Sequence, residues 1–402
     1  MPTPESVDWR AWLRLSLTPG VGDITARELL ACFGSPEQVF AQPSQVLKEA
    51  VGQARSAALR AEPAGLAELC ATTRQWLEAA PDRGILTLTD PRYPAELLEM
   101  ADPPLVLYWQ GRVELLAHPQ RLAVVGSRNP TAQGVLNAGQ MGRALGAAGV
   151  CIVSGLALGI DGAAHEGALD GGGTTIAVVG TGLDRVYPRR HLALAHRIAQ
   201  QGLLLSEFAL GSPPNPSHFP KRNRIIAGLS QGTLVVEAAL ASGSLITAQL
   251  AADMGREVFA IPGSIHSTLA KGCHALIRQG AKLVETAQDV LEDMRLVMAP
   301  DATATADATD AQDAPGLQGA GTPPANAVGA APEGLPGTAL GTVPGVPGQV
   351  LQTMGFDPLS LDALQARSGH LAADLQAWLM ELELDGHVAR LPGGLFQRLV
   401  RA

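Results

Sequence analysis

The sequence predicts an α/β fold: a Rossmann-like, doubly wound and mostly parallel sheet, with a small all-α N-terminal domain and a C-terminal winged-helix-like domain. Two observations predict the sheet. Between residues 121 and 298, short apolar runs alternate with amphipathic segments of roughly ten to fifteen residues, as β–α–β units require. Glycine-rich turns follow several of these runs, at the strand ends where open parallel sheets bind ligands. We expect this domain to span residues 83–298.

The first expected strand sets the pattern for the others. Its four apolar residues run directly into the turn Gly126–Arg128, after which Asn129 and Pro130 predict an N-cap and a first helical residue. Backbone N–H groups at such a helix start attract anions, and Arg128 adds a positive charge suited to phosphate. The expected strands are Leu122–Val125, Val150–Val153, Thr174–Val179, Leu203–Ser206, Thr233–Val236, Val258–Ile261 and a short one near Lys282–Val284.

Residues 1–82 predict a small helical domain, because helical patterns alternate there with short turns. The first turn, Leu17–Gly22, resembles that of a helix-hairpin-helix, which offers backbone N–H groups to a DNA phosphate. A tight turn within a helical bundle explains the same residues equally well. Residues 84–116 then show strand-like alternation and several prolines, which predicts an extended layer leading into the sheet.

The chain beyond the sheet divides into a linker and a tail. Residues 299–348 are too poor in large apolar side chains to offset chain entropy, so we expect a disordered linker. In the tail, residues 349–402, one apolar helical face precedes a predicted hairpin over His387–Leu399, an order that favours a winged helix. The apolar face consists of Leu371, Leu375, Trp378, Leu379 and Leu382.

Composition restricts the class of function. The 402 residues include 29 Lys and Arg against 38 Asp and Glu, a formal net charge of −9, so any nucleic-acid site must be a local basic patch. The four cysteines show no C-x-x-C spacing, which predicts a reduced, cytoplasmic protein without a zinc site. No apolar run reaches the ~18 residues of a membrane span, so we expect no membrane association.

Four glycine-rich strand ends are candidates for phosphate binding: residues 126–128, 154–161, 180–184 and 242–244. None completes a G-x-G-x-x-G, because Arg185 stands where the third glycine belongs, and no Walker A Gly-Lys-Ser or Gly-Lys-Thr occurs. ATP hydrolysis through a P-loop is therefore disfavoured, and we expect no cofactor. Taken together, the four turns predict a lined crevice at one edge of the sheet.

One acid–base cluster, Asp161, His165 and Glu166, falls in this region. Asp161 and His165 lie at i and i+4 on one helical face. A zinc-binding pair would need a second His where Leu169 stands, so we expect no metal. A hydrogen-bonded network at the helix start is the favoured interpretation, and a catalytic role is the alternative.

An aromatic residue stands beside several cations in residues 219–224. Phe219 precedes Lys221, Arg222 and Arg224 at an otherwise apolar helix start. Stacking on an aromatic ring accepts any base, and Lys and Arg neutralise phosphates, so this cluster suits a single-stranded nucleic acid. The alternative is that Phe219 anchors the core while the cations lie on a solvated turn.

Five stretches together resemble the DNA-processing protein A family (DprA, also called Smf), in the family's order over about residues 84–290. They are GSR at 126–128, SGLALGIDGAAH at 154–165, GTGLDRVYP at 180–188, FPKRNRIIAGLS at 219–230 and SGSLITA at 242–248. The resemblance implies a bacterial cytoplasmic protein that binds single-stranded DNA, forms a homodimer and loads the RecA recombinase during natural transformation. It implies no known catalytic turnover. The DNA-binding residues that it implies are Arg128, Phe219, Lys221, Arg222 and Asn223, with Gly126, Ser127, Ser244 and Thr247 as further pocket-lining groups.

The chain departs from the family pattern at a few positions. Leu158 stands where many members have a basic residue, and His191 and His274 stand where Asn is usual. The long helix of the tail carries four acids, which disfavour its entry into a DNA groove and favour a protein-docking or structural role. These acids are Asp374, Glu381, Glu383 and Asp385.

Two other functions stay open at this point. A nucleotide-processing hydrolase would use Glu237 with Asp161 and His165, although residues 229–233 lack the glycine run that such enzymes place before their acidic helix. A double-stranded DNA-binding regulator would act through the winged helix. For Ser244 and Thr247, helix capping is the default alternative to phosphate contact.

Overall fold

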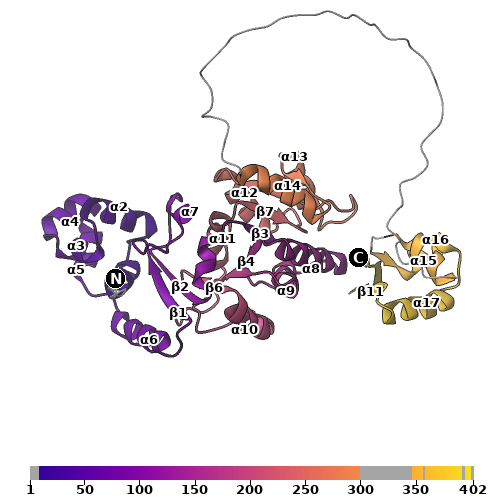
Figure 1. Cartoon of the computed structure of the whole chain (residues 1–402), viewed down its shortest axis with the longest axis horizontal. Coiled ribbons are helices and arrows are strands. Elements are labelled where there is room, and N and C mark those ends of the chain that lie inside the picture. The colour runs from indigo at the N-terminus through magenta and orange to yellow at the C-terminus, as the bar shows by residue number, and fades with distance from the viewer. Residues whose placement is uncertain (1–8, 299–345, 356–357, 392–393, 400–402) are drawn as a thin grey trace, which may run out of the picture. The chain divides into compact units, whose positions relative to one another are not determined.

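The computed structural model describes residues 9–298, 346–355, 358–391 and 394–399 (Figure 1). The chain divides into two compact units, residues 1–294 and 295–402, and each is described by itself. Most of the predicted linker lies outside the described residues. Helix α15 (Val346–Met354) begins at Val346, so the last three residues of the predicted linker, 346–348, are helical.

The larger unit is built around one nine-stranded sheet with the order β1-β2-β6-β5-β4-β3-β7-β8-β9. Strands β3 to β9 pair in parallel, whereas β1 is antiparallel to β2, and β2 is antiparallel to β6. The mostly parallel sheet is confirmed, and every expected strand lies within one residue of its predicted bounds. The strands are β1 (Arg83–Thr87), β2 (Val106–Gly111), β3 (Arg121–Val125), β4 (Cys151–Ser154), β5 (Thr175–Val178), β6 (Leu203–Ser206), β7 (Gly232–Val235), β8 (Glu257–Ala260) and β9 (Lys282–Leu283).

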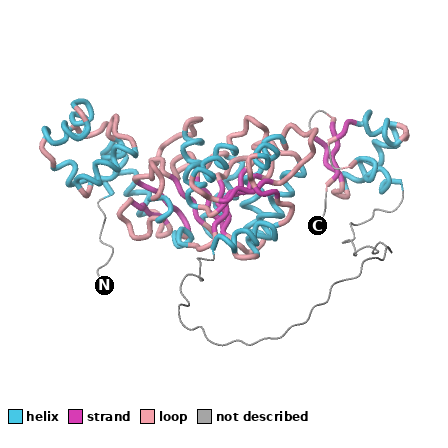
Figure 2. The backbone as a smooth tube through the Cα atoms, turned by 90° about the horizontal axis from the view of Figure 1, so that it is seen from above, coloured by secondary structure: helices cyan, strands magenta, loops and turns pink. Residues whose placement is uncertain are grey.

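Helices cover both faces of this sheet (Figure 2). Along β3, Leu122 and Val124 pack into a core with α8, α9 and α14, while Ala123 and Val125 pack into a core with α7, α11, α12 and α13. Because both faces are buried, the strands are continuous apolar runs in the sequence. The helices are α7 (Ala95–Leu98), α8 (Ala132–Ala147), α9 (Ile160–Asp170), α10 (Leu192–Gln201), α11 (His218–Leu229), α12 (Ser244–Asp253), α13 (Lys271–Arg278) and α14 (Ala287–Met298), with short 3₁₀ helices η1 (Val113–Ala117) and η2 (Arg189–His191).

The strand order reverses beside β3, which pairs with β4 on one side and β7 on the other. The loops after β3 and β7 lead to helices on opposite faces of the sheet, so a crevice opens at the carboxyl ends of these two strands. Helix α8 begins later than predicted, because Thr131 and not Asn129 is its N-cap. The Thr131 hydroxyl accepts from the Gly134 N–H at 3.0 Å and donates to Glu237 at 2.8 Å. The Asn129 N–H instead donates to the Ser127 hydroxyl, at 3.1 Å, so residues 126–130 form a loop and Arg128 is exposed.

A helical N-terminal region precedes β1 (Figure 1). The turn between its first two helices is tied to other parts of the chain: Arg55 donates to the Gly20 carbonyl at 2.9 Å, and Asp23 pairs with Lys221 on α11. These contacts favour a structural role for the turn. The helices are α1 (Trp9–Leu17), α2 (Asp23–Phe33), α3 (Pro36–Ala41), α4 (Ser44–Val51), α5 (Gln53–Arg60) and α6 (Leu66–Glu78).

The tail forms a winged-helix arrangement, as predicted. Three helices, α15, α16 (Leu361–Ser368) and α17 (Ala372–Leu384), pack on an antiparallel sheet of order β10-β12-β11. Leu375, Leu379 and Leu382 are buried, but Leu371 is 69% exposed and lies outside the core. The prediction for Leu371 is wrong because this residue precedes α17 as its N-cap and not as part of its apolar face. The strands are β10 (Leu359–Ser360), β11 (Val388–Leu391) and β12 (Leu395–Arg398).

Candidate nucleic-acid interface

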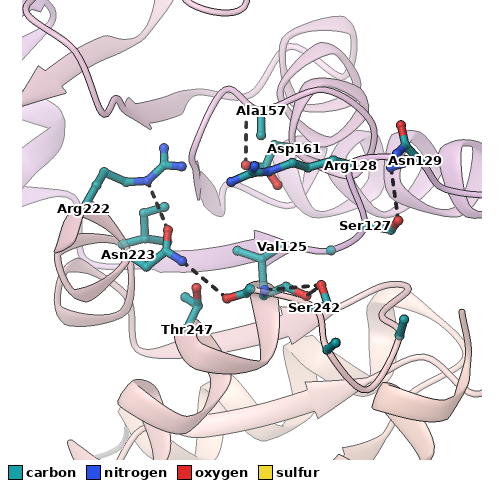
Figure 3. Close-up of a pocket in the computed structure, with 16 residues that line it drawn as sticks. Val125, Ser127, Arg128, Asn129, Ala157, Asp161, Arg222, Asn223, Ser242 and Thr247 are labelled. Carbon is teal, nitrogen blue, oxygen red and sulfur yellow. Dashed lines mark hydrogen bonds between the residues drawn. The ribbon is translucent and has the colours of Figure 1, made fainter. Parts of the chain in front are cut away.

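A pocket of ≈ 440 Å³ opens at the carboxyl ends of the central strands (Figure 3). Its walls come from the loops after β3, β4 and β7 and from the helices α11 and α12. Seven of the nine residues implied by the resemblance line it, whereas Phe219 and Lys221 do not. The residues that line the pocket include Gly126, Ser127, Arg128, Asn129, Ala157, Asp161, Arg222, Asn223, Ser242, Gly243, Ser244 and Thr247.

Arg128 connects the pocket to the predicted aromatic ring. Its guanidinium carbon lies 4.9 Å from the centre of the Phe219 ring, a cation–π arrangement. Arg128 is exposed and Phe219 is half-buried at the start of α11. Phe219 therefore stands beside the pocket and joins it through Arg128.

Arg222 forms a fixed, buried wall of the pocket. Its side chain donates to the carbonyls of Gly155 and Val178, and its Nε donates to Oδ1 of Asn223 at 3.1 Å. Burial lowers the pKa of Arg222 to about 10, against the opposing effect of Asp161, so the guanidinium stays charged at neutral pH. These bonds hold the Arg222 charge in place at the pocket.

Asp161 provides the matching buried acid. Its Oδ2 accepts from the backbone N–H groups of Gly155, at 3.1 Å, and Ala157, at 3.3 Å. Burial raises the pKa of Asp161, while Arg222 and the two N–H donors lower it. This carboxyl fixes the loop after β4, in agreement with the favoured interpretation of a network at the helix start.

The start of α12 completes the opposite wall. Ser244 is the first residue of this helix, and Ser242, Gly243, Ser244 and Thr247 all line the pocket. The side-chain amide of Asn223 donates to the Gly243 carbonyl at 3.4 Å, which ties α11 to this loop (Figure 3). The N–H groups of Ser244 and Leu245 already donate to Ser242, so what this wall offers an anion is the partial positive charge of the helix N-terminus.

Lys221 and Arg224 turn away from the pocket toward an acidic group. The ammonium of Lys221 lies 2.9 Å from Asp23 and 3.3 Å from Glu207. Although burial alone would lower it, these two carboxylates raise the pKa of Lys221. Arg224 is buried and pairs with Glu207 and with Asp102. The basic segment seen in the sequence is thus divided between the pocket and an internal ion-pair network.

The acid–base groups of the hydrolase hypothesis do not converge. Glu237 accepts from the Thr131 N–H at 3.0 Å and from its hydroxyl, and it does not line the pocket. His165 is fully buried with Nδ1 2.6 Å from the Thr175 hydroxyl, and burial lowers its pKa to about 3, so its ring is neutral. Within the described ranges, no group of three His, Cys, Asp or Glu side chains is placed to hold a metal ion.

The structure adds one aromatic residue that residue patterns alone did not single out. The ring centre of Tyr187 lies 5.9 Å from that of Phe219. The signal in the sequence is its position in the glycine-rich turn after β5, at the same sheet edge as the pocket. The three departures from the family pattern lie outside the pocket lining; His191 contacts the Leu156 carbonyl, and His274 that of Gly263.

Two segments of the chain match known protein-family models. Residues 84–295, more than half of the chain and all of the pocket, match DNA recombination-mediator protein A, and residues 336–394 match the DprA winged helix domain. The chain belongs to the DNA recombination-mediator protein A family.

Relatives of this recombination-mediator family cover the chain widely. Protein Smf of Escherichia coli is 40% identical over 331 residues, which are 81% of this chain and 80% of that protein. DNA processing protein DprA of Streptococcus pneumoniae is 50% identical over 207 residues, covering 52% of this chain and 73% of that protein. The X-ray structure of DprA from Streptococcus pneumoniae shares 39% identity and a TM-score of 0.61, covering 70% of this chain and 95% of that one.

The recombination-mediator match places the pocket in the central domain and assigns a winged helix to the tail. Helix α17 of this winged helix exposes Asp374, Glu381 and Glu383 to solvent, and its C-cap Asp385 is exposed as well. No helix in the described part of the chain is long and apolar enough to cross a membrane.

Proposed function

We propose that this chain binds single-stranded DNA at the pocket and loads the RecA recombinase onto that strand during natural transformation. In this proposal it acts in the cytoplasm as a homodimer, without catalytic turnover. Family membership supports the general class, a mediator of DNA recombination. The residues in contact with the strand would be those that line the pocket together with Phe219.

One observation carries the DNA-binding part of the proposal: the exposed Arg128 links an anion-attracting pocket to an aromatic ring outside it. A single small anion could bind in the pocket without using Phe219. A ligand that uses both must extend from the α12 N-terminus across Arg128 to the ring. A single strand, with a charged backbone and bases free to stack, has this chemistry.

The absence of turnover in the proposal is supported by the state of the acids. Asp161 accepts two backbone N–H groups, and Glu237 is engaged by Thr131. A general base must reach a substrate proton within about 3 Å, and Glu237 does not line the pocket. Released base after incubation with nucleoside monophosphates would contradict this part.

A mobility-shift comparison tests DNA binding directly. The full-length protein should shift a single-stranded oligonucleotide more strongly than the matching duplex, and Arg128→Ala should weaken the shift. Equal binding of both DNA forms, or an unchanged shift with Arg128→Ala, would contradict the proposal.

The recombinase step needs a separate measurement. Single-strand-dependent ATP hydrolysis by RecA, started on DNA already covered by a single-strand-binding protein, should begin sooner when the full-length chain is added. An unchanged lag, with DNA binding intact, would exclude loading while leaving the DNA site in place.

A further inference from the structure

The turn after β5 carries an aromatic ring that the pocket does not account for. Tyr187 is 47% exposed, whereas the other two tyrosines, Tyr93 and Tyr108, are buried. Of the Phe, Trp and Tyr side chains that the structure describes, Tyr187 alone is exposed. A single exposed aromatic is ordinary on a protein surface, so its meaning depends on what lies next to it.

Tyr187 extends the line that begins in the pocket. Its ring centre is 5.9 Å from that of Phe219, with the two planes inclined by 35°. The Arg128 guanidinium lies 4.9 Å from the centre of the same Phe219 ring. Pocket, Arg128, Phe219 and Tyr187 therefore form one continuous series of contacts at the sheet edge.

Phe219 has less free ring surface to offer a base than Tyr187 has. The backbone of Gly180 lies against it, since a Cβ added at Gly180 would come within 3.1 Å of the ring. Arg128 lies over the ring as well. Phe219 therefore offers the strand only part of its ring and supports its neighbour, whereas the exposed Tyr187 ring is placed to receive a base.

Positive charge follows Tyr187 directly. Arg189 and Arg190 lie in η2, two and three residues further along, and both are exposed. Neither has an ion-pair partner among the residues described. Alternation of an aromatic ring with unpaired cations is the arrangement that binds a single strand without regard to its sequence.

We propose that Tyr187 forms a base-stacking subsite for single-stranded nucleic acid, adjoining the pocket, with Phe219 as the support for its ring. The strand leaves the pocket past Arg128, stacks one base on Tyr187 and continues toward η2. This inference rests on the proposed function, and it names the residue that takes a base.

The test compares two oligonucleotides of equal length, oligo-dT and an abasic strand, by fluorescence anisotropy with the full-length chain. Tyr187→Ala should bind oligo-dT about 5- to 10-fold more weakly than the wild type, within the range measured for one base–aromatic stack. It should lose less than about 2-fold on the abasic strand, because the phosphate contacts remain. Tyr187→Phe is the matched control, since it keeps the ring and should bind both strands as the wild type does.

Each contrary outcome has a distinct meaning. Equal binding of oligo-dT by Tyr187→Ala and the wild type overturns the subsite. An equal loss on both strands also overturns it, because the ring would then only support the loop. Photo-crosslinking of 5-iodouracil oligonucleotides to the wild-type chain needs no variant; the adduct should map to Tyr187, and an adduct elsewhere counts against the subsite. If the wild type binds neither strand, the proposed function itself fails.

Discussion

Replacing Arg128 by Ala should weaken single-stranded DNA binding in a way that depends on salt. Arg128 is exposed, forms no ion pair among the described residues although Asp161 lies within electrostatic range, and stands where the pocket meets Phe219. A hydrogen bond to a charged group contributes about 1.5–3 kcal/mol, and an exposed one lies near the lower end. We therefore expect about a tenfold loss of affinity at 50 mM salt, which corresponds to ~1.4 kcal/mol.

The salt dependence of binding tests the phosphate contact of Arg128 more specifically than the loss of affinity at one salt concentration does. Each phosphate neutralised on a single strand contributes ~0.7 to the slope of log K against log salt. Loss of one contact over a fourfold rise in salt changes the ratio of affinities by about 2.6-fold. The tenfold deficit at 50 mM should therefore shrink to roughly fourfold at 200 mM. Fluorescence anisotropy titrations of oligo-dT at several salt concentrations measure both quantities.

Arg143→Ala is the matched control, because it removes the same charge from α8. Its side chain is 62% exposed, pairs with Asp170 at 3.6 Å and does not line the pocket. It should leave both affinity and slope unchanged. An equal loss in the two variants would mean that net charge alone governs binding, and an unchanged slope in Arg128→Ala would refute the phosphate contact.

Three further outcomes follow from the structure. Arg222→Ala should lower the free energy of unfolding by about 3–5 kcal/mol in urea titrations, because it removes the donor to two buried carbonyls and leaves Asp161 without its charge partner; a loss under 1 kcal/mol would contradict this. His165 has a pKa of about 3 in the folded chain and 6.5 in the unfolded chain. Between these two pH values the unfolded chain binds a proton at His165 and the folded chain does not. Its stabilisation is therefore complete above pH 6.5 and declines toward pH 3, by about 2 kcal/mol at pH 5, and His165→Gln should flatten that decline in urea titrations. A chain ended after residue 298 should keep its affinity for single-stranded DNA in mobility shifts, since α17 exposes acids and contains no Lys or Arg. A tenfold loss of affinity would show that the winged helix takes part in DNA binding.

The sheet was predictable because its strands are buried on both faces. A strand such as β3 has no polar face, so its four apolar residues and the following glycine marked it without further information. The start of α8 was not predictable in the same way. Asn129 and Thr131 both carry side chains that cap helices, and the choice of Thr131 depends on Glu237, more than a hundred residues further along the chain.

The position of the pocket was predictable from the sequence, and so were two of its cations, Arg128 and Arg222, but the orientation of Lys221 and Arg224 was not. Glycine turns at strand ends indicated the crevice, and seven of the nine residues named for it lie there. Consecutive residues of a helix point in directions about 100° apart, so Lys221 and Arg222 could not serve the same surface. Lys221 and Arg224, three residues apart, share a face, and the acids opposite them belong to α2 and to the loop after β6. The direction of each cation therefore depended on segments that only the fold brings near.

This division of the cations determines how strongly salt should weaken binding. Lys221 and Arg224 are held by Asp23 and Glu207, and Arg222 is buried with its charge opposed by Asp161, so we expect none of the three to add a counterion-releasing phosphate contact. The exposed cations along the inferred path that have no ion-pair partner among the described residues are Arg128, Arg189 and Arg190. Three phosphate contacts at ~0.7 each give a slope near −2 for an oligonucleotide that fills one site, whereas all six cations would give about −4. Asp23→Asn removes one of the two carboxylates that hold Lys221, so it should steepen the slope by at most about 0.7. A wild-type slope near −4 would contradict this reasoning. It would show that Lys221, Arg222 and Arg224 leave their acidic partners and contact phosphates when DNA binds.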